Sequence, residues 1–273
     1  MFQTPVYRTR TSGLLGMLEV TYHTIVRSAR GGHRNAVIGM VLNMVQGLTM
    51  VVAFLIFFQI LGLRSSPIRG DMMLFIMSGV FVYMTHIKAL SAVMSAAGPT
   101  SSMMLHRPMN TIVAILAAAV STLYSQFITL LVILSIYHIG FNPITIHDPI
   151  AAMGLFLLAW FSGCAVGMIF LALKPWFPRF TGIAKTIYTR VNMIASGKMF
   201  VVNTLPASTM AMFDWNPLFH NIDQMRGAVF LHYNPQFTNI SYPIYLSLAL
   251  IMIGLMGEFF ARKHVSISWF AGR

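Results

Sequence analysis

Long apolar segments, separated by short polar connections, make up most of the chain. Five of them have the roughly 20 mostly apolar residues that a helix needs to cross a bilayer. These predicted spans cover residues 36–63, 72–97, 110–138, 150–173 and 241–261. The pattern therefore predicts an all-α membrane protein.

A sixth segment, residues 181–203, is apolar but interrupted by polar side chains. Lys185, Arg190, Asn192 and Lys198 fall within it. We count it as a sixth span because an even number of spans keeps both ends of the chain on one side of the membrane, as the distribution of basic residues requires.

Basic residues are distributed unequally between the two sides of this predicted bundle. With the N-terminus inside, the inner side collects twelve Lys and Arg residues and the outer side three. This asymmetry follows the positive-inside rule and predicts that both termini are cytoplasmic. The inner residues are Arg8, Arg10, Arg27, Arg30, Arg34, Arg107, Lys174, Arg179, Lys185, Arg262, Lys263 and Arg273, and the outer ones are Arg64, Arg69 and Arg226.

The stretch between the last two predicted spans indicates a helix too short to cross the membrane. Asn216 is a favourable N-cap and Pro217 suits the first helical position. About 14 residues at roughly 1.5 Å each reach about 21 Å, against a hydrocarbon core of roughly 30 Å. We expect a re-entrant helical pair at 204–232, on the extracellular side. Its apolar face holds Leu218, Ile222, Met225 and Val229, and His220, Asp223, Gln224 and Arg226 lie elsewhere.

Residues 13–30 predict a basic amphipathic helix that lies along the inner membrane surface. Two interpretations remain open, a simple interfacial anchor and a surface that also contacts a cytoplasmic partner. Its apolar positions are Leu14, Leu15, Leu18, Tyr22, Ile25 and Val26, and its polar positions are Glu19, His23, Arg27 and Arg30.

Composition agrees with a polytopic membrane protein. The chain of 273 residues is 57% hydrophobic and 9% charged, with a mean hydropathy of +0.73. We expect one membrane domain, residues 36–262, between an N-terminal segment (1–35) and a C-terminal tail (263–273), and no cleaved signal peptide. The net charge of +12 comes from residues at the ends of apolar segments, which disfavours nucleic-acid binding.

Motifs for catalysis, nucleotide binding or metal binding are missing from the sequence. The only Gly-Lys pair, Gly197-Lys198, is followed by Met199, so there is no phosphate-binding loop. The nine histidines contain no H-E-x-x-H pattern. Of the six acidic residues only Glu258 falls within a predicted span, and no internal repeat is visible, which disfavours a proton-driven carrier. We therefore expect no cofactor on this chain.

Several residues within the predicted spans are candidates for packing or transport. Arg190 and Lys198, eight residues apart, could share one helix face and either pair structurally or line a wet path for an anionic or hydroxylated solute. Gly163 and Gly167 form a small-xxx-small pair that favours helix packing over a dimer seam. His86 is expected to make a hydrogen bond within the bundle. The single cysteine, Cys164, excludes an intrachain disulfide.

The region from Ser196 to Arg226 resembles the ABC-2 type permeases that export bacterial polysaccharides, the capsule and O-antigen export family. The likeness begins at Ser196-Gly197-Lys198-Met199-Phe200 and continues through Leu205-Pro206. Asp223 stands where the family pattern usually has Glu, and Lys198 where it usually has an apolar residue. The most specific part is an N-P-L-x-H-x-x-(D/E)-x-x-R motif, carried by Asn216, Pro217, Leu218, His220, Asp223 and Arg226.

The resemblance covers nearly the whole chain and implies a homodimer in the bacterial inner membrane. Two copies of a separate cytoplasmic ABC ATPase subunit would bind ATP and magnesium and hydrolyse the ATP. The cargo would be a lipid-linked polysaccharide, and membrane lipid and periplasmic export components are further implied partners. The loop from Gly98 and Pro99 to His106, Arg107 and Pro108 would couple the ATPase to the spans. The implied translocation path has Arg190, Lys198, Tyr83, Tyr124, Tyr188 and Phe200 as candidate linings.

Two other functions remain open. An exporter of the same superfamily could carry a drug, a lipid or a teichoic-acid-type polymer. A membrane-embedded transferase would need a carboxylate or histidine cluster near the headgroups, for which His147, Asp148 and Asp214 are the available residues.

Overall fold

The computed structural model describes residues 36–62, 66–96 and 111–264. The predicted amphipathic helix at 13–30 and the predicted coupling loop at 98–108 lie outside these residues. The described part is helical and contains eight α-helices, one short 3-10 helix and no strand. In chain order they are α2 (Ala36–Ile60), α3 (Met72–Met94), α4 (Thr111–Gly140), α5 (Pro149–Leu173), α6 (Pro178–Ala195), η2 (Val202–Thr204), α7 (Ala207–Ala211), α8 (Pro217–Val229) and α9 (Ser241–His264).

Five of the described helices are long and apolar enough to cross a membrane, so the chain is a multi-pass membrane protein. They are α2, α3, α4, α5 and α9, which confirms the five strong spans of the sequence. The weaker segment at 181–203 contains α6, which has 18 residues, among them Arg179, Lys185 and Arg190. Helix α6 is not among the five.

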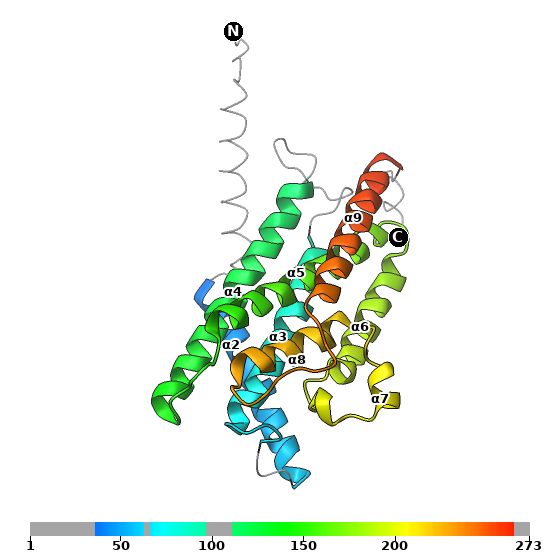
Figure 1. The fold of residues 1–273 in the computed structure, drawn as a ribbon. Coiled ribbons are helices and arrows are strands. Elements are labelled where there is room, and N and C mark those ends of the chain that lie inside the picture. Colours follow the sequence, from blue (N-terminus) through cyan, green and yellow to red (C-terminus); the bar gives the residue numbers. More distant parts are fainter. Residues whose placement is uncertain (1–35, 63–65, 97–110, 265–273) are drawn as a thin grey trace.

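The long helices alternate in direction along the bundle (Figure 1). Helices α2, α4 and α6 run toward one end, and α3, α5 and α9 run away from it. Residues 66–71, 141–148 and 196–240 meet at that end, which we call the α8 end. Hydrogen bonds join these segments, for example from the main-chain N–H of Asp148 to the carbonyl of Ala228 (2.8 Å).

Helix α3 forms the centre of the bundle. In its most apolar 18-residue stretch 83% of the residues are buried, against 22% in α2 and in α9. Helix α5 packs closely on it: a Cβ added at Gly163 would lie 2.3 Å from the carbonyl oxygen of His86, and one at Gly167 would lie 2.8 Å from that of Leu90. The prediction that this glycine pair serves helix packing is confirmed, and its partner is α3.

Helix α6 ends at Ala195, eight residues before the predicted end of its span. The main-chain N–H of Ser196 donates to the carbonyls of Asn192 and Ile194, and Gly197 follows with a φ of +75°. Glycine takes this left-handed conformation at little cost, so it terminates the helix as a C-cap glycine does. The prediction that Arg190 and Lys198 share one helix face is therefore wrong, because Lys198 lies beyond the end of α6.

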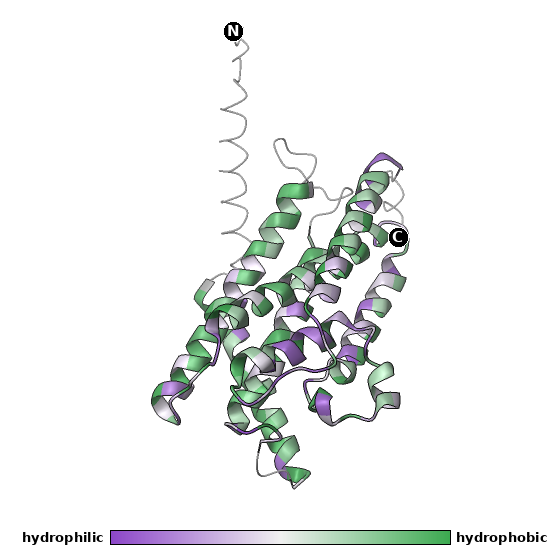
Figure 2. Ribbon diagram, viewed as in Figure 1, coloured by the Kyte–Doolittle hydropathy of each residue, from purple (hydrophilic) through white to green (hydrophobic). Residues whose placement is uncertain are grey.

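The short helix before the last span is confirmed as α8, with 13 residues. Asn216 is its N-cap, accepting from the main-chain N–H of Leu218 at 3.0 Å, and Pro217 is its first residue. Helix α8 packs against α3, α5 and α9. Figure 2 shows hydrophilic colours gathered on α8 and on the segment after it, amid largely hydrophobic helices. Helix α7 has five residues, none of them buried.

Candidate functional site

The residues of the N-P-L-x-H-x-x-D-x-x-R motif lie on or next to α8, and each polar member makes a tertiary contact. Asn216 joins α8 to the end of α6: its side-chain amide donates to the Asn192 side chain at 2.9 Å and to the carbonyl of Ala195 at 3.0 Å. Asn216 is 1% exposed, so these bonds are shielded from solvent. It is therefore both a helix cap and a link between two helices.

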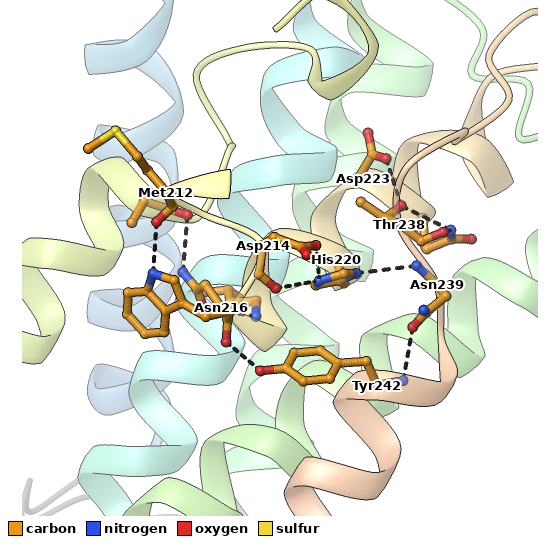
Figure 3. A network of polar contacts seen from close by, with 12 residues as sticks. Met212, Asp214, Asn216, His220, Asp223, Thr238, Asn239 and Tyr242 are labelled. Atoms are coloured by element: carbon orange, nitrogen blue, oxygen red, sulfur yellow. Dashed lines mark hydrogen bonds and ion pairs between the residues drawn. The ribbon is translucent and has the colours of Figure 1, made fainter. Parts of the chain in front are cut away.

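His220, one turn into α8, connects the chain before the helix to the chain after it (Figure 3). Its Nε2 lies 2.7 Å from the main-chain carbonyl of Asp214 and 3.1 Å from the Asp214 carboxylate. Its Nδ1 accepts from the main-chain N–H of Asn239 at 3.2 Å. Because Nδ1 accepts, the proton of a neutral ring is on Nε2. The imidazole thus fixes the distance between the two segments that flank α8.

Asp223 receives two hydroxyl donors from the segment after α8. Tyr233 Oη donates to one carboxylate oxygen, and Thr238 Oγ1 donates to the other at 2.7 Å. The side-chain amide of Gln224 donates to the main-chain carbonyl of Thr238 at 2.8 Å. Burial raises the pKa of Asp223, and the two hydroxyls, Arg226 and His220 oppose that effect. The contacts fold residues 230–240 back along α8.

Arg226 is fully buried and ties α8 to the turn after α6. Its guanidinium donates to three main-chain carbonyls: those of Gly197 (3.0 Å), Lys198 (2.8 Å) and Phe200. The ring of Phe75 on α3 lies 4.2 Å from its Cζ. Burial lowers the pKa of Arg226 to about 10, which leaves it a cation at neutral pH. Arg226, which the charge pattern assigns to the outer side, is thus buried within the protein and supports the turn from within.

The turn that Arg226 holds presents Lys198 to an aromatic surface. Lys198 is 2% exposed, and its Nζ lies 3.3 Å from the ring centroid of Tyr83 and 5.0 Å from that of Phe54. No hydrogen-bond partner of this ammonium is found in the described part of the chain. Burial lowers its pKa to about 7. The two ring faces stabilise the charged ammonium of Lys198. Its burial without a hydrogen bond has the opposite effect and favours loss of the proton.

The structure brings together only some of the six candidate path residues. Tyr83 contacts Lys198 and donates to the carbonyl of Thr189 on α6 at 3.1 Å. Tyr188 on α6 bonds His86 at 2.9 Å. Arg190 and Tyr124 are both exposed, but Arg190 lies on α6 and Tyr124 lies on α4. The region where α3, α6 and the 196–200 turn meet is therefore the candidate path, and Tyr124 lies outside it.

Phe200 belongs to the same turn but faces the segment that precedes α8. Its ring lies 5.6 Å from that of Phe213, which in turn lies 6.1 Å from Phe219 on α8. Gly197 sits beside this stack, because a Cβ added there would lie 2.9 Å from the ring of Phe219. The turn is thus packed against α3 by Lys198 and against α8 by Gly197 and Phe200.

Hydrogen bonds within the bundle include the expected one of His86. Its ring bonds Ser162 on α5 and Tyr188 on α6, both at 2.9 Å, which confirms that prediction. A second cluster was missed: Lys88 Nζ donates to Asn43 Oδ1 on α2 at 2.7 Å, and the Asn43 amide donates to Ser125 on α4 at 2.9 Å. Asn43 and Lys88 occur within predicted spans, so their polar nature alone was a signal.

The three residues considered for a transferase do not form one site. Asp148 caps α5 by accepting from the main-chain N–H groups of Ile150 and Ala151. Its own N–H binds Ala228 at the C-terminal end of α8, whereas Asp214 binds His220 near the N-terminal end. A 13-residue helix is roughly 20 Å long, so the two carboxylates lie at opposite ends of it. Among the described residues no group of three His, Cys, Asp or Glu side chains is placed to hold a metal ion.

No protein-family model matches this chain, and the search of curated proteins finds no matching relative.

Proposed function

We propose that this chain is the permease subunit of an ATP-driven exporter that moves a lipid-linked polysaccharide across the bacterial inner membrane. The proposal includes a homodimer, two ATPase subunits that bind ATP and magnesium, and cytoplasmic termini. The observation that carries it is that the four polar residues of the motif form the hydrogen bonds that hold the α8 end of the bundle together. These residues are Asn216, His220, Asp223 and Arg226.

The architecture supports a passive conduit. The catalytic residues of an enzyme would be free to meet a substrate, whereas the polar motif residues are engaged in contacts that position α8 and the turn after α6. Such an element can move as one body when an external motor acts on the spans. An energy source on a separate subunit fits a sequence that has no phosphate-binding loop.

Helix α6 is the sixth crossing of this proposal. It runs antiparallel to α5 and ends at the α8 end (Figure 1). It also has an exposed apolar stripe beside exposed cations, which suits a helix that contacts a second protomer on one side and a wet path on the other. The stripe consists of Phe180, Ile183, Ile187, Val191 and Ile194.

The candidate path supports a glycan as cargo. Aromatic ring faces pack against the apolar C–H faces of sugars, and cations pair with acidic sugars or phosphate. Tyr83 and Lys198 provide one aromatic ring and one cation. Tyr188 and Arg190 provide a second ring and cation on the neighbouring helix. Loading of the glycan would expose Lys198, whose ammonium is buried against Tyr83 in this structure.

Purification with and without a cytoplasmic partner tests the proposal. The chain alone should show no ATPase activity, and activity should appear when a nucleotide-binding subunit co-purifies with it. A deletion strain should lose surface glycan while its drug sensitivity stays unchanged. A chain that functions without any ATPase partner overturns the proposal, and lost drug resistance with intact glycan assigns the chain to a different cargo.

Alanine substitution of His147, Asp148 and Asp214 separates the permease from a transferase. Unchanged glycan export in the triple variant is expected, provided that the variant reaches the membrane in normal amount. Loss of a chemical product that the wild-type chain forms on its own, without ATP, would favour the enzyme.

A further inference from the structure

Two adjoining cavities lie where α3, α4 and α5 meet the α8 end, on the side of the bundle away from α6. One has a mixed polar and apolar lining, has a volume of about 350 Å³ and is lined mainly by the connecting segments 69–71, 143–147 and 229–232. The other is apolar, has a volume of about 200 Å³ and extends between the helices. Leu74, Ile146 and Val229 line both, so the cavities adjoin each other. We call them the mouth and the slot.

The slot is shaped for a hydrocarbon chain. Along α4 its lining runs from Leu134 to Phe127, seven residues or about 10 Å. Among the described residues that line it, the one polar side chain is Ser78, and its hydroxyl donates to the carbonyl of Phe75. An apolar cavity of roughly 150 Å³ accepts a guest as large as benzene, so the slot has room for several methylene groups.

The slot lies between α4 and α5 and is open at its edge. The two helices are joined farther along, where Trp160 Nε1 donates to the carbonyl of Ala119 at 2.8 Å. Phe127 and Phe156, with ring centroids 6.4 Å apart, lie at the inner end of the slot. At its edges Leu131 is 47% exposed and Met153 is 39% exposed. Since α3, α4 and α5 are membrane spans, this opening faces the bilayer region.

The mouth is suited to an anionic group. Arg69, His147 and His232 line it, and all three are exposed. Within the described residues none of these side chains forms an ion pair. The acid in the mouth, Asp71, is already engaged: it accepts from the N–H of Met73 (2.8 Å), from Tyr137 (2.5 Å) and from Asn142 (3.3 Å). Burial would raise the pKa of Asp71, but these hydrogen bonds together hold it below its ordinary value. Arg69 is thus an exposed cation with no ion-pair partner among the described residues, whereas the carboxylate of Asp71 is held by three hydrogen bonds.

We propose that the mouth and the slot form a binding site for an anionic membrane phospholipid, with its phosphate beside Arg69 and part of one acyl chain between α4 and α5. The occupant follows from the geometry: an opening that carries an exposed arginine at the level of the connecting segments adjoins an apolar slot among three spans. A lipid is also the amphiphile that surrounds such an opening at high concentration. The site is separate from the candidate glycan path and does not depend on the export function.

Native mass spectrometry of the purified, delipidated protein tests the site, with phosphatidylglycerol as the probe. Long-chain phosphatidylglycerol should bind more tightly than phosphatidylcholine of the same chain length. Arg69→Gln should weaken phosphatidylglycerol binding about five-fold, the factor expected for one basic side chain at an anionic headgroup, and should leave phosphatidylcholine binding unchanged. Arg179→Gln, an exposed arginine on α6, is the matched control and should change neither.

A matched pair on α4 tests the slot. Leu131→Trp places an indole at the slot, whereas Leu116→Trp changes a leucine of nearly equal exposure, 48% against 47%, outside it. Leu131→Trp should reduce lipid binding at least five-fold, and Leu116→Trp should not. Equal binding by both variants overturns the proposal.

Two further outcomes also overturn the proposal. Displacement of the lipid by inorganic phosphate alone would show a phosphate site without need of the acyl chain. A change of oligomeric state in Leu131→Trp, seen in the same spectra without a change in lipid binding, would show that the slot is covered by a second copy of the chain. Because the readout is bound lipid, loss of this site is distinguishable from failure of the export function.

Discussion

Arg226 on α8 donates a 2.8 Å hydrogen bond to the main-chain carbonyl of Lys198, 28 residues earlier in the chain. The same guanidinium also binds the carbonyls of Gly197 and Phe200. A turn whose carbonyls point inward at one buried cation cannot move without α8. The bond therefore joins the candidate path residue Lys198 to the motif as one mechanical unit.

Arg226→Gln should destabilise the protein by about 3–5 kcal/mol, because a shorter neutral amide leaves buried carbonyls of the turn without donors. Arg226→Lys keeps the charge but lacks the planar fork of five N–H donors, so we expect only partial rescue. Thermal unfolding in detergent measures both. Arg179→Gln changes an exposed arginine and should shift the midpoint little. Equal unfolding midpoints for Arg226→Gln and wild type would contradict the conclusion that Arg226 holds the turn after α6.

Gly197→Ala should destabilise the turn after α6. The φ of +75° costs an L-residue about 1–2 kcal/mol, and the new Cβ would lie 2.9 Å from the ring of Phe219. Gly182→Ala, within α6, is the control: its Cβ would meet nothing within 4 Å, and alanine favours a helix by up to about 1 kcal/mol. The two variants should move the unfolding midpoint in opposite directions. A shift in the same direction would show that φ is not the determinant.

Local signals in the sequence were sufficient for most of the helices and for α8. An uninterrupted apolar run identifies a span without knowledge of its neighbours, and Asn216-Pro217 identifies a helix start from two residues. The end of α6 was also readable, since Ser196-Gly197 is a typical helix terminus, but the expectation of a full span outweighed it. That choice produced the wrong placement of Lys198.

The partners of the buried polar side chains were not readable from the sequence. Arg226 binds main-chain carbonyls, which every residue possesses, so no sequence pattern marks its acceptors. Lys88 and Asn43 are joined across two helices, and their pairing depends on packing that one sequence does not encode locally. The six candidate path residues were predicted from side-chain type, which does not specify where in the bundle a residue lies. The sequence therefore did not show that Tyr124, on α4, lies apart from the others.

Gly163→Ala should impair the central packing of the bundle. The added methyl would lie 2.3 Å from the carbonyl oxygen of His86, so α5 must move away from α3, at a cost of about 3 kcal/mol or more. Gly154→Ala, on the same helix with nothing within 4 Å, is the matched control and should be neutral or stabilising. The yield of folded protein in size-exclusion chromatography and the unfolding midpoint report both. Similar behaviour of the two variants would mean that α3 and α5 are not in close contact.

Lys198 should make the stability of the protein depend on pH in the alkaline range. Its pKa is lowered by burial to about 7, against 10.5 for an exposed lysine, so between these values the unfolded chain binds one more proton than the folded chain. Stability should then rise with pH from about 7 to about 10, by at most about 1.4 kcal/mol per pH unit, and should be independent of this group below pH 7.

Lys198→Met isolates that contribution, because methionine keeps an apolar chain of similar length against Tyr83 and Phe54 but carries no proton. The variant should be as stable as wild type or more so at pH 7, since it removes an ammonium without a hydrogen bond from the interior. Its unfolding midpoints at pH 7, 8 and 9 should also change less than those of the wild type. Lys185→Met, on the half-buried part of α6, is the control and should retain the wild-type slope. If wild type and Lys198→Met follow parallel curves, the ammonium is not buried in the folded protein, and the contact with Tyr83 does not hold the turn.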